Sequence, residues 1–291
     1  MSIRAYGLNE HLVALALKEL VRRAIVIAQR QITTFESGGK IGYDGEMSDV
    51  FTSADKKAQA SYVKSLQEGF PNIGIIGEED SLNIPSADGL DAYFTIDPLD
   101  GTRAYIRRQS HGVGTMVALV IDGVIESAYI GDLNTQEVFG YRPESSHVWR
   151  ITDLEVCEEL NSNPPERAIS ELYILLRERE KKYSEIALKT IDAFKGVSID
   201  GGSIGIWAAR LWKGEVGALL LYPGWETPWD SSPVVGISQK LGYVFLRPFN
   251  DAWEVYQPQI GQKKYWRDHE AIIIHSNNLL ALSKVMRIYF C

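Results

Sequence analysis

The stretch LDAYFTIDPLDGT, residues 90–102, constrains the fold more than any other part of the sequence. Its first seven residues predict a strand, and Asp97 and Asp100 stand where that strand ends. Proteins of the α/β type usually place their chemistry at strand ends. Two carboxylates this close repel each other unless a positive charge lies between them. The stretch therefore predicts a site that needs a cation.

The composition of the 291-residue chain is that of a globular protein, with 45% hydrophobic and 23% charged residues. Its net charge of -8 argues against a nucleic acid polymer as partner, which would need a basic face. An acidic enzyme can still bind an anionic substrate if metal ions supply positive charge. The two cysteines, Cys157 and Cys291, form neither a disulfide framework nor a CxxC pair, which favours a reducing, cytoplasmic setting. Apolar runs are too short for a signal peptide or a membrane span, so no membrane partner is expected.

Helical periodicity appears twice in the first part of the chain. Apolar residues recur at helical spacing over 9–32, and again over 52–70, where Thr52 or Ser53 is a candidate N-cap. The polar, glycine-rich segment 36–51 between them predicts a loop of the kind that can move. These features predict two helices joined by a long loop.

Short apolar runs after residue 70 predict strands. Runs that form a buried strand and then a largely antiparallel sheet lie at 72–80, 112–122, 123–132 and 135–142. Turn formers at 162–167 mark a junction, after which strands alternate with helices, beginning with a strand that continues into a helix through residue 194. The predicted fold class is α+β, with an α+β half at 1–160 and an α/β half at 161–291 that completes the site.

Acidic residues form three clusters, each of which follows a predicted apolar strand or opens a predicted helix. The clusters are Glu78, Glu79 and Asp80; Asp97 and Asp100; and Asp230. Carboxylate oxygens suit hard cations such as magnesium and manganese. Asp97 is well placed to bridge two ions, and the carbonyl of Leu99 could add a ligand because Pro98 stiffens the turn.

Each of these residues also has a purely structural interpretation. Glu79 and Asp80 could be solvated surface acids, and Asp230 could cap the following helix. Asp97 and Asp100 could cap a turn. Gly101 and Thr102 allow both interpretations as well. If a helical turn starts there, its amides attract an anion and the Thr102 hydroxyl could hold a water; otherwise they form an ordinary turn with a capping threonine.

The motifs GEED, DPLDGT and PWDSSP resemble, in order and spacing, the lithium-sensitive phosphatase superfamily that includes inositol monophosphatase. The resemblance implies an α/β/α/β/α sandwich of the sugar-phosphatase type. It implies metal ligands at Glu78, Asp97, the Leu99 carbonyl, Asp100 and Asp230. It also implies a water activated by Thr102 with Asp55, a secondary catalytic role for Glu79, and phosphate or substrate contacts at Gly101, Thr102, Arg103, Gly202 and Ser203.

The resemblance further implies a magnesium-dependent phosphate monoester hydrolase, in the form of a homodimer, that acts on a small phosphorylated metabolite. Two or three Mg²⁺ ions are expected, with Mn²⁺ as a substitute and Li⁺ as an inhibitor. Inositol monophosphatase is the first candidate activity; histidinol-phosphatase, 3'(2'),5'-bisphosphate nucleotidase, fructose-1,6-bisphosphatase and a catalytically silent regulator stay open. Three departures from the family pattern leave the ligands in place: Ser231 and Ser232 replace the usual alanines, QKLG stands where EAGG is usual, and Arg103 replaces a frequent threonine.

Overall fold

Two long helices form the first layer of the computed structural model, which describes residues 3–42, 45–47, 49–87, 89–152, 156–177 and 183–289. Helix α1 (Glu10–Gln31) begins after Asn9, whose side chain accepts hydrogen bonds from the next backbone amides. Helix α2 (Ser53–Gly69) begins with a capping box formed by Thr52 and Asp55. Both helices and the Thr52 cap confirm the sequence prediction, and η1 (Ile3–Tyr6) precedes them.

The first sheet has the strand order β10-β9-β8-β7-β6-β5-β3-β4. Neighbouring strands in this sheet run antiparallel, except for the parallel pair of β3 and β5. The prediction of a largely antiparallel sheet is therefore confirmed. Its strands are β3 (Gly74–Gly77), β4 (Asn83–Ile84), β5 (Ala92–Asp100), β6 (Gly114–Ile121), β7 (Val124–Asp132), β8 (Val138–Tyr141), β9 (Trp149–Ile151) and β10 (Cys157–Glu159). Every residue of β6 is buried because helices cover both faces of this sheet.

The second sheet has the order β12-β11-β13-β18-β15-β16-β19. Its strands are β11 (Tyr173–Leu176), β12 (Gly196–Ile199), β13 (Ala218–Leu221), β15 (Tyr243–Phe249), β16 (Ala252–Tyr256), β18 (Ala271–His275) and β19 (Ile288–Tyr289). Helices α5 (Ile204–Trp212) and α6 (Pro228–Lys240) lie between the two sheets and contact both. Helices α4 (Glu185–Ala193) and α7 (Leu279–Ser283) cover the outer face.

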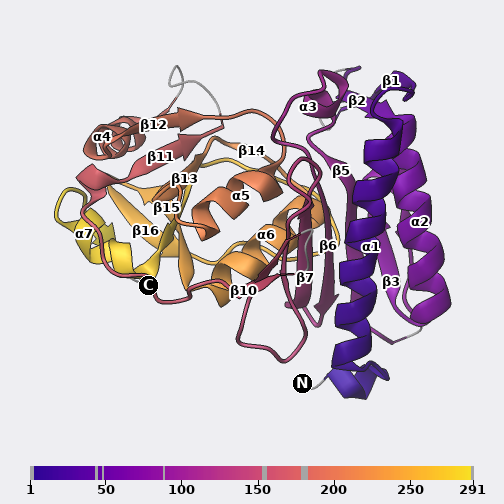
Figure 1. Ribbon diagram of the computed structural model, residues 1–291. Coiled ribbons are helices and arrows are strands. Elements are labelled where there is room, and N and C mark those ends of the chain that lie inside the picture. The colour runs from indigo at the N-terminus through magenta and orange to yellow at the C-terminus, as the bar shows by residue number, and fades with distance from the viewer. Residues whose placement is uncertain are drawn as a thin grey trace.

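Five layers result, in the order helices, sheet, helices, sheet, helices (Figure 1). The α+β class and the layered sandwich are thereby confirmed. One apolar core fills the space between α1, α2 and the first sheet, and a second joins both sheets through α5 and α6. The chain passes from one sheet to the other between Glu159 and Tyr173, and we propose the division at 160/161 as two halves sharing one helical layer.

Two expectations differ from the structure. The predicted loop at 36–51 contains an antiparallel hairpin of β1 (Ser37–Lys40) and β2 (Asp49–Thr52), which pairs through backbone groups that hydrophobic periodicity does not report. The helix expected to follow β11 directly begins only at Glu185 with Ser184 as its N-cap, while residues 178–182 of that prediction lie outside the described residues. Within the described part of the chain, no helix has the length and apolar character needed to cross a membrane.

Shorter elements complete the fold. They are α3 (Thr102–Ile106), η2 (Glu79–Ser81), η3 (Ile169–Glu171), η5 (Ser276–Asn278), β14 (Gly224–Glu226) and β17 (Tyr265–Arg267). Strands β14 and β17 pair with each other as a separate antiparallel ribbon. This ribbon and α3 both contribute residues to the cavity described next.

Candidate metal and phosphate site

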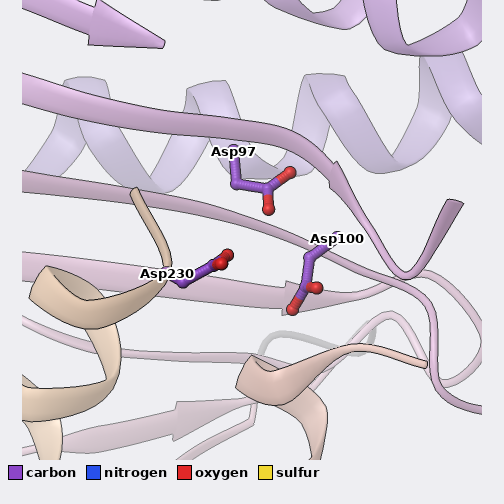
Figure 2. Close-up of side chains that lie close together, drawn as sticks. All are labelled: Asp97, Asp100 and Asp230. Carbon is purple, nitrogen blue, oxygen red and sulfur yellow. The ribbon is translucent and has the colours of Figure 1, made fainter. Parts of the chain in front are cut away.

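Three carboxylates converge where β5 ends beside the first turn of α6 (Figure 2). One oxygen from each of Asp97, Asp100 and Asp230 lies within 4.8 Å of the other two. The register of β5 against β6 shifts between Asp97 and Asp100, which lets the strand leave the sheet at this point. Asp97 also accepts a hydrogen bond from the Leu99 amide at 3.0 Å, so it closes a turn as well as facing the other acids.

The alternative interpretation of Asp230 as a helix cap is wrong. Thr227 caps α6, with its hydroxyl oxygen 3.3 Å from the Asp230 amide, and Asp230 lies in the first helical turn. Thr102 is likewise not a cap, because Gly101 occupies that position of α3. Both side chains are therefore directed to other partners.

Burial and mutual repulsion dominate the electrostatics of the three aspartates. Burial raises the pKa of Asp97 well above its ordinary range, and the charges of neighbouring carboxylates raise it further. Burial, followed by the charges of Asp100 and Glu78, raises the pKa of Asp230 to about 7. Buried like charges are stable together only when protonated or when a cation compensates them. Because every donor is a hard oxygen, this set fits magnesium or manganese.

Asp100 is held by the start of α5. Its Oδ2 accepts a hydrogen bond from the Ser203 hydroxyl and another, at 3.1 Å, from the Gly205 amide. Burial raises the pKa of Asp100, while these hydrogen bonds and the charge of Arg177 oppose the rise. The Ser203 hydroxyl also accepts from the Ile206 amide at 3.1 Å. The side chain predicted to contact substrate thus orients a carboxylate.

Glycines allow the end of β5 to approach the start of α5. Gly101 has φ +86°, and a Cβ there would lie 2.3 Å from the Gly112 carbonyl oxygen. Gly202 has φ +113°, and its Cβ would lie 2.2 Å from the same atom. A side chain at either position would collide with backbone. The close approach is fixed by a hydrogen bond from the Ser203 amide to the Gly112 carbonyl at 2.8 Å.

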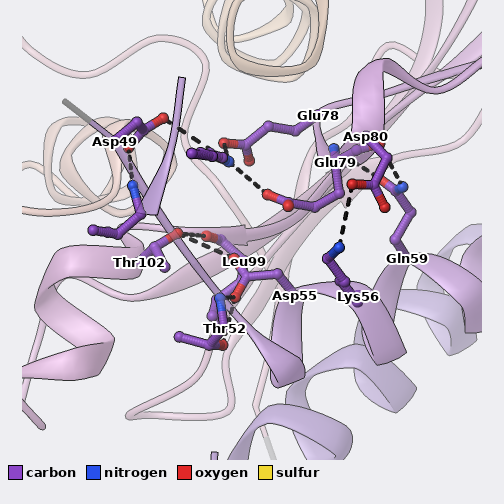
Figure 3. Close-up of polar contacts among 12 residues, drawn as sticks. Asp49, Thr52, Asp55, Lys56, Gln59, Glu78, Glu79, Asp80, Leu99 and Thr102 are labelled. Atoms are coloured by element: carbon purple, nitrogen blue, oxygen red, sulfur yellow. Dashed lines mark hydrogen bonds and ion pairs between the residues drawn. The ribbon is translucent and has the colours of Figure 1, made fainter. Parts of the chain in front are cut away.

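Thr102 and Asp55 are in hydrogen-bond contact (Figure 3). The Thr102 Oγ1 lies 3.1 Å from Asp55 Oδ1 and 3.1 Å from the Leu99 carbonyl oxygen. Since the hydroxyl has one proton, it can donate fully to only one of these acceptors. The other oxygen of Asp55 accepts from the Thr52 amide at 2.7 Å. Burial raises the pKa of Asp55 to about 6, and the hydrogen bond from Thr52 opposes the rise.

Lys40 joins Glu78 and Glu79. Its Nζ lies 2.8 Å from Glu78 Oε1 and 2.6 Å from Glu79 Oε1, and Figure 3 shows both glutamates beside the Thr102 contact. Glu79 is buried, and the side-chain amide of Gln59 bonds to both its amide and its carbonyl, at 3.0 and 2.9 Å. Glu78 lines the same cavity as the aspartates, which is described next. Glu79 lies outside that lining and forms an ion pair with Lys40.

A cavity of about 670 Å³ brings together most of the residues predicted for the site. Those that line it are Glu78, Asp97, Leu99, Asp100, Gly101, Thr102, Arg103, Gly202 and Asp230. Asp55, Glu79 and Ser203 lie behind this lining, bonded to Thr102, Lys40 and Asp100 respectively. The predicted residues therefore form a lining and a supporting layer.

Sequence reasoning missed several residues at the site: Lys40, Arg107, Arg177, Trp225 and Trp266. Arg177 directly follows the buried strand β11, the same strand-end position that singled out the acids. That rule, applied to basic residues too, would have found it. Lys40 lies in the segment expected to be a loop, and the tryptophans carry no motif.

Comparison with solved structures places this fold among the inositol monophosphatase structures. An IMPase from Thermotoga maritima has a TM-score of 0.67 at 15% identity, and the match covers 92% of this chain and 94% of that chain. A structure described as IMPase/NADP phosphatase complexed with Mg²⁺ and phosphate has a TM-score of 0.67 at 17% identity, with 90% of each chain covered. At these identities the likeness concerns the fold alone.

The sequence comparison defines the family. The sequence model of the inositol monophosphatase family matches residues 9–281, and the chain belongs to that family. The Nus factor SuhB of Pseudomonas aeruginosa is 34% identical over 91 residues, 31% of this chain and 33% of that protein. A histidinol-phosphatase of Chlorobaculum parvum is 26% identical over 202 residues, 66% of this chain and 70% of that protein. The match thus spans about a third of the length of the SuhB proteins of Pseudomonas aeruginosa and Salmonella typhimurium.

Proposed function

We propose that the protein is a magnesium-dependent phosphate monoester hydrolase acting on a small phosphorylated metabolite. The observation that carries this proposal is the convergence of three buried carboxylates beside the Thr102–Asp55 contact in one cavity. Family membership supports it, and so does the solved structure of similar fold that is described as complexed with Mg²⁺ and phosphate. Arg103, Arg107 and Arg177 line the same cavity and would attract an anionic substrate.

The proposed metal ligands are the oxygens that line the cavity. Glu78, Asp97, the Leu99 carbonyl, Asp100 and Asp230 would hold two or three Mg²⁺ ions, with Mn²⁺ as a substitute and Li⁺ as an inhibitor. Bound magnesium would neutralise phosphate charge and lower the pKa of an attacking water. We expect Asp97 to serve two ions at once, since it faces both Glu78 and the other aspartates.

The chain's own residues would position the phosphate and accept the proton. The amides of Gly101 and Thr102 open α3 and would bind phosphate oxygens. The Thr102 hydroxyl would accept a hydrogen bond from water while donating to Asp55 Oδ1. Asp55 would then receive the proton through the Thr102 hydroxyl. A pKa of about 6 suits a base that works near neutral pH. When the hydroxyl donates to Asp55, the Leu99 carbonyl is left available for a cation.

Two predicted residues are better described as positioning residues. Ser203 would fix the orientation of Asp100, and Glu79 would fix Lys40 next to Glu78. Substitution of such groups usually lowers metal affinity or activity by about 10- to 100-fold. We further expect a homodimer, which sedimentation equilibrium would test.

A catalytically silent metal- or phosphate-binding regulator is the second candidate, because several curated relatives are named Nus factors. Hydrolysis of p-nitrophenyl phosphate with Mg²⁺, with excess EDTA, and with the Asp97→Asn variant tests the two. Turnover that requires Mg²⁺ and Asp97 supports the enzyme. Full turnover in EDTA contradicts the metal site, and no turnover of any phosphate monoester favours the regulator. A screen of inositol 1-phosphate, histidinol phosphate, 3'-phosphoadenosine 5'-phosphate and fructose 1,6-bisphosphate then addresses the substrate.

A further inference from the structure

A second cavity, of about 380 Å³, adjoins the proposed metal site. It lies among β13, α6, β15, β16 and the ribbon of β14 and β17. Four residues line both cavities: Arg177, Trp225, Asp230 and Trp266. A ligand whose phosphate lies at the carboxylates could therefore extend its other end into this second space. Its volume is within the range of pockets that hold small molecules.

Most side chains that line the second cavity are apolar or aromatic, and two arginines and two carboxylates line it as well. The apolar and aromatic ones include Leu221, Val234, Phe245, Tyr256 and Ile273. Such a surface matches a flat, apolar group, because aromatic rings gain contact area without leaving polar atoms unpaired.

Two of the four charged residues that line this cavity, Arg267 and Glu226, already bond to each other. Arg267 donates to Glu226 at 2.7 Å and to the Tyr222 carbonyl at 2.9 Å. The Ser231 hydroxyl donates to the second oxygen of Glu226 at 2.7 Å. A leaving group with many hydroxyls would give up its hydrogen bonds to water on entering the cavity. The polar groups that are already bonded to each other could replace few of those hydrogen bonds. A ring with few polar atoms would lose little.

Two tryptophans stand at the boundary between the cavities. Trp225 and Trp266 face each other across β14 and β17, with ring centroids 5.7 Å apart and planes at 77°. They remain 37% and 53% exposed. The Lys264 ammonium lies 5.5 Å from the centroid of the Trp225 ring and covers one of its faces. Adjacent exposed tryptophans at a cavity boundary often mark a ligand-binding surface, and an aromatic ring could make edge-to-face or stacked contact with this pair.

We propose that this second cavity, with the Trp225–Trp266 pair, binds a planar aromatic or heteroaromatic leaving group of the phosphate monoester. The inference rests on the proposed phosphatase function and narrows its substrate class. It favours monoesters bearing an imidazole or purine ring over phosphates of polyols. Arg177, which lines both cavities, would lie near the ester linkage of such a substrate.

Benzyl phosphate and cyclohexylmethyl phosphate form the test pair. Both leave as a primary alcohol carrying a six-membered ring, so they differ mainly in ring flatness and aromaticity. We expect the wild-type protein with Mg²⁺ to prefer benzyl phosphate by about tenfold or more in kcat/KM, within the range of aromatic stacking contributions. Trp225→Leu and Trp266→Leu should each remove most of this preference through KM, because kcat/KM should fall more for benzyl phosphate than for cyclohexylmethyl phosphate. Trp149→Leu is the matched control, since Trp149 is also 37% exposed but belongs to β9 of the first sheet.

Equal hydrolysis of the two esters, or equal losses for both in the tryptophan variants, would overturn the inference and leave the phosphatase proposal standing. If neither ester is hydrolysed, the p-nitrophenyl phosphate assay and the substrate screen still decide the phosphatase proposal, and the cavity is tested by binding instead. Calorimetry with benzylphosphonate and cyclohexylmethylphosphonate in Mg²⁺ then decides. A preference for benzylphosphonate that Trp225→Leu abolishes supports the inference, whereas equal affinity or no binding overturns it.

Discussion

Two acidic clusters lie side by side in this protein, and they differ in how their charge is compensated. Glu78 and Glu79 share the ammonium of Lys40, with contacts of 2.8 and 2.6 Å. The three aspartates Asp97, Asp100 and Asp230 instead face one another within 4.8 Å. The first cluster carries its own cation. No ion pair to a basic side chain is found for the second cluster among the described residues, which is the property expected of a metal site.

Arg177 does not remove this difference. Its charge lowers the pKa values of Asp100 and Asp230, yet burial and carboxylate repulsion keep both raised. Glu78 connects the clusters, because it pairs with Lys40 and also raises the pKa of Asp97. We infer that the chain places a fixed positive charge at one edge of the site and reserves the centre for mobile cations.

The largest effect is expected for Asp97→Asn. If Asp97 is the shared ligand of the uncompensated cluster, the variant should lose about a thousandfold or more in kcat, as for loss of a group that stabilises charge in the transition state. The fold should survive, since removing one buried negative charge relieves repulsion. The control is Asp80→Asn, an exposed acid paired with Lys56, which should keep normal turnover. A larger loss for Asp230→Asn than for Asp97→Asn would show that our order of ligands is wrong.

The second effect concerns the contact between Thr102 and Asp55. Thr102→Ala should lower kcat by roughly a hundredfold, the scale of general acid–base assistance, and Thr102→Ser should retain much of the activity. Asp55→Asn should resemble Thr102→Ala, and the double variant should be little worse than either, because residues that act as a unit are not additive. Asp55→Asn should also cost about 1 kcal/mol of stability, since Asp55 belongs to the capping box of α2. Additive losses in kcat would mean that the two residues act separately.

The outcome for these residues shows what the sequence could predict. Asp97, Asp100 and Thr102 occupy one short stretch after an apolar strand, so pattern and motif found them together. The hydrogen bonds that support these residues could not be predicted from the sequence, because the contact of Ser203 with Asp100 depends on how α5 packs against the end of β5.

Lys40 and the tryptophan pair were missed for two different reasons. Lys40 ends a strand of Ser37 and glycines, which pairs through its backbone and has no apolar alternation to detect. Trp225 meets Trp266 only through the register of β14 and β17, strands of three residues each. Local pattern predicts elements well where one face is apolar, and it fails where pairing is set by distant partners.

The third effect tests whether Lys40 competes with metal. Lys40→Gln removes the cation that holds Glu78 and Glu79, so their carboxylates should attract Mg²⁺ more strongly, by about tenfold in affinity. The metal-free variant should also melt at a lower temperature. Titration of Mn²⁺ by electron paramagnetic resonance measures the affinity. Lys56→Gln is the control, since it breaks the exposed pair with Asp80 and the contact with the Phe51 ring and leaves Glu78 and Glu79 paired with Lys40. Weaker metal binding in Lys40→Gln would instead make Lys40 a support for the site.

The smallest effect is a pH dependence of stability in the metal-free protein. The pKa of Asp230 is raised to about 7 in the folded state, against an ordinary value near 4 when unfolded. Between these values the folded state binds more protons than the unfolded state, so this group makes the free energy of unfolding fall as pH rises. Asp230→Asn removes the group, and its stability relative to wild type should therefore increase from pH 4 to pH 7. Because the neighbouring aspartates share the repulsion, we expect only about 1 kcal/mol.

Urea denaturation in EDTA at several pH values measures this difference, with Asp192→Asn on the exposed face of α4 as the control. Saturating Mg²⁺ should reverse the sign, since the ionised carboxylates then bind the metal and the wild-type protein gains stability that the variant lacks. Curves that stay parallel from pH 4 to pH 7 in EDTA would mean that the aspartates are already compensated within the chain. The contrast between the two acidic clusters would then have no physical basis, and Lys40 and Arg177 together would have to be regarded as sufficient for all five carboxylates.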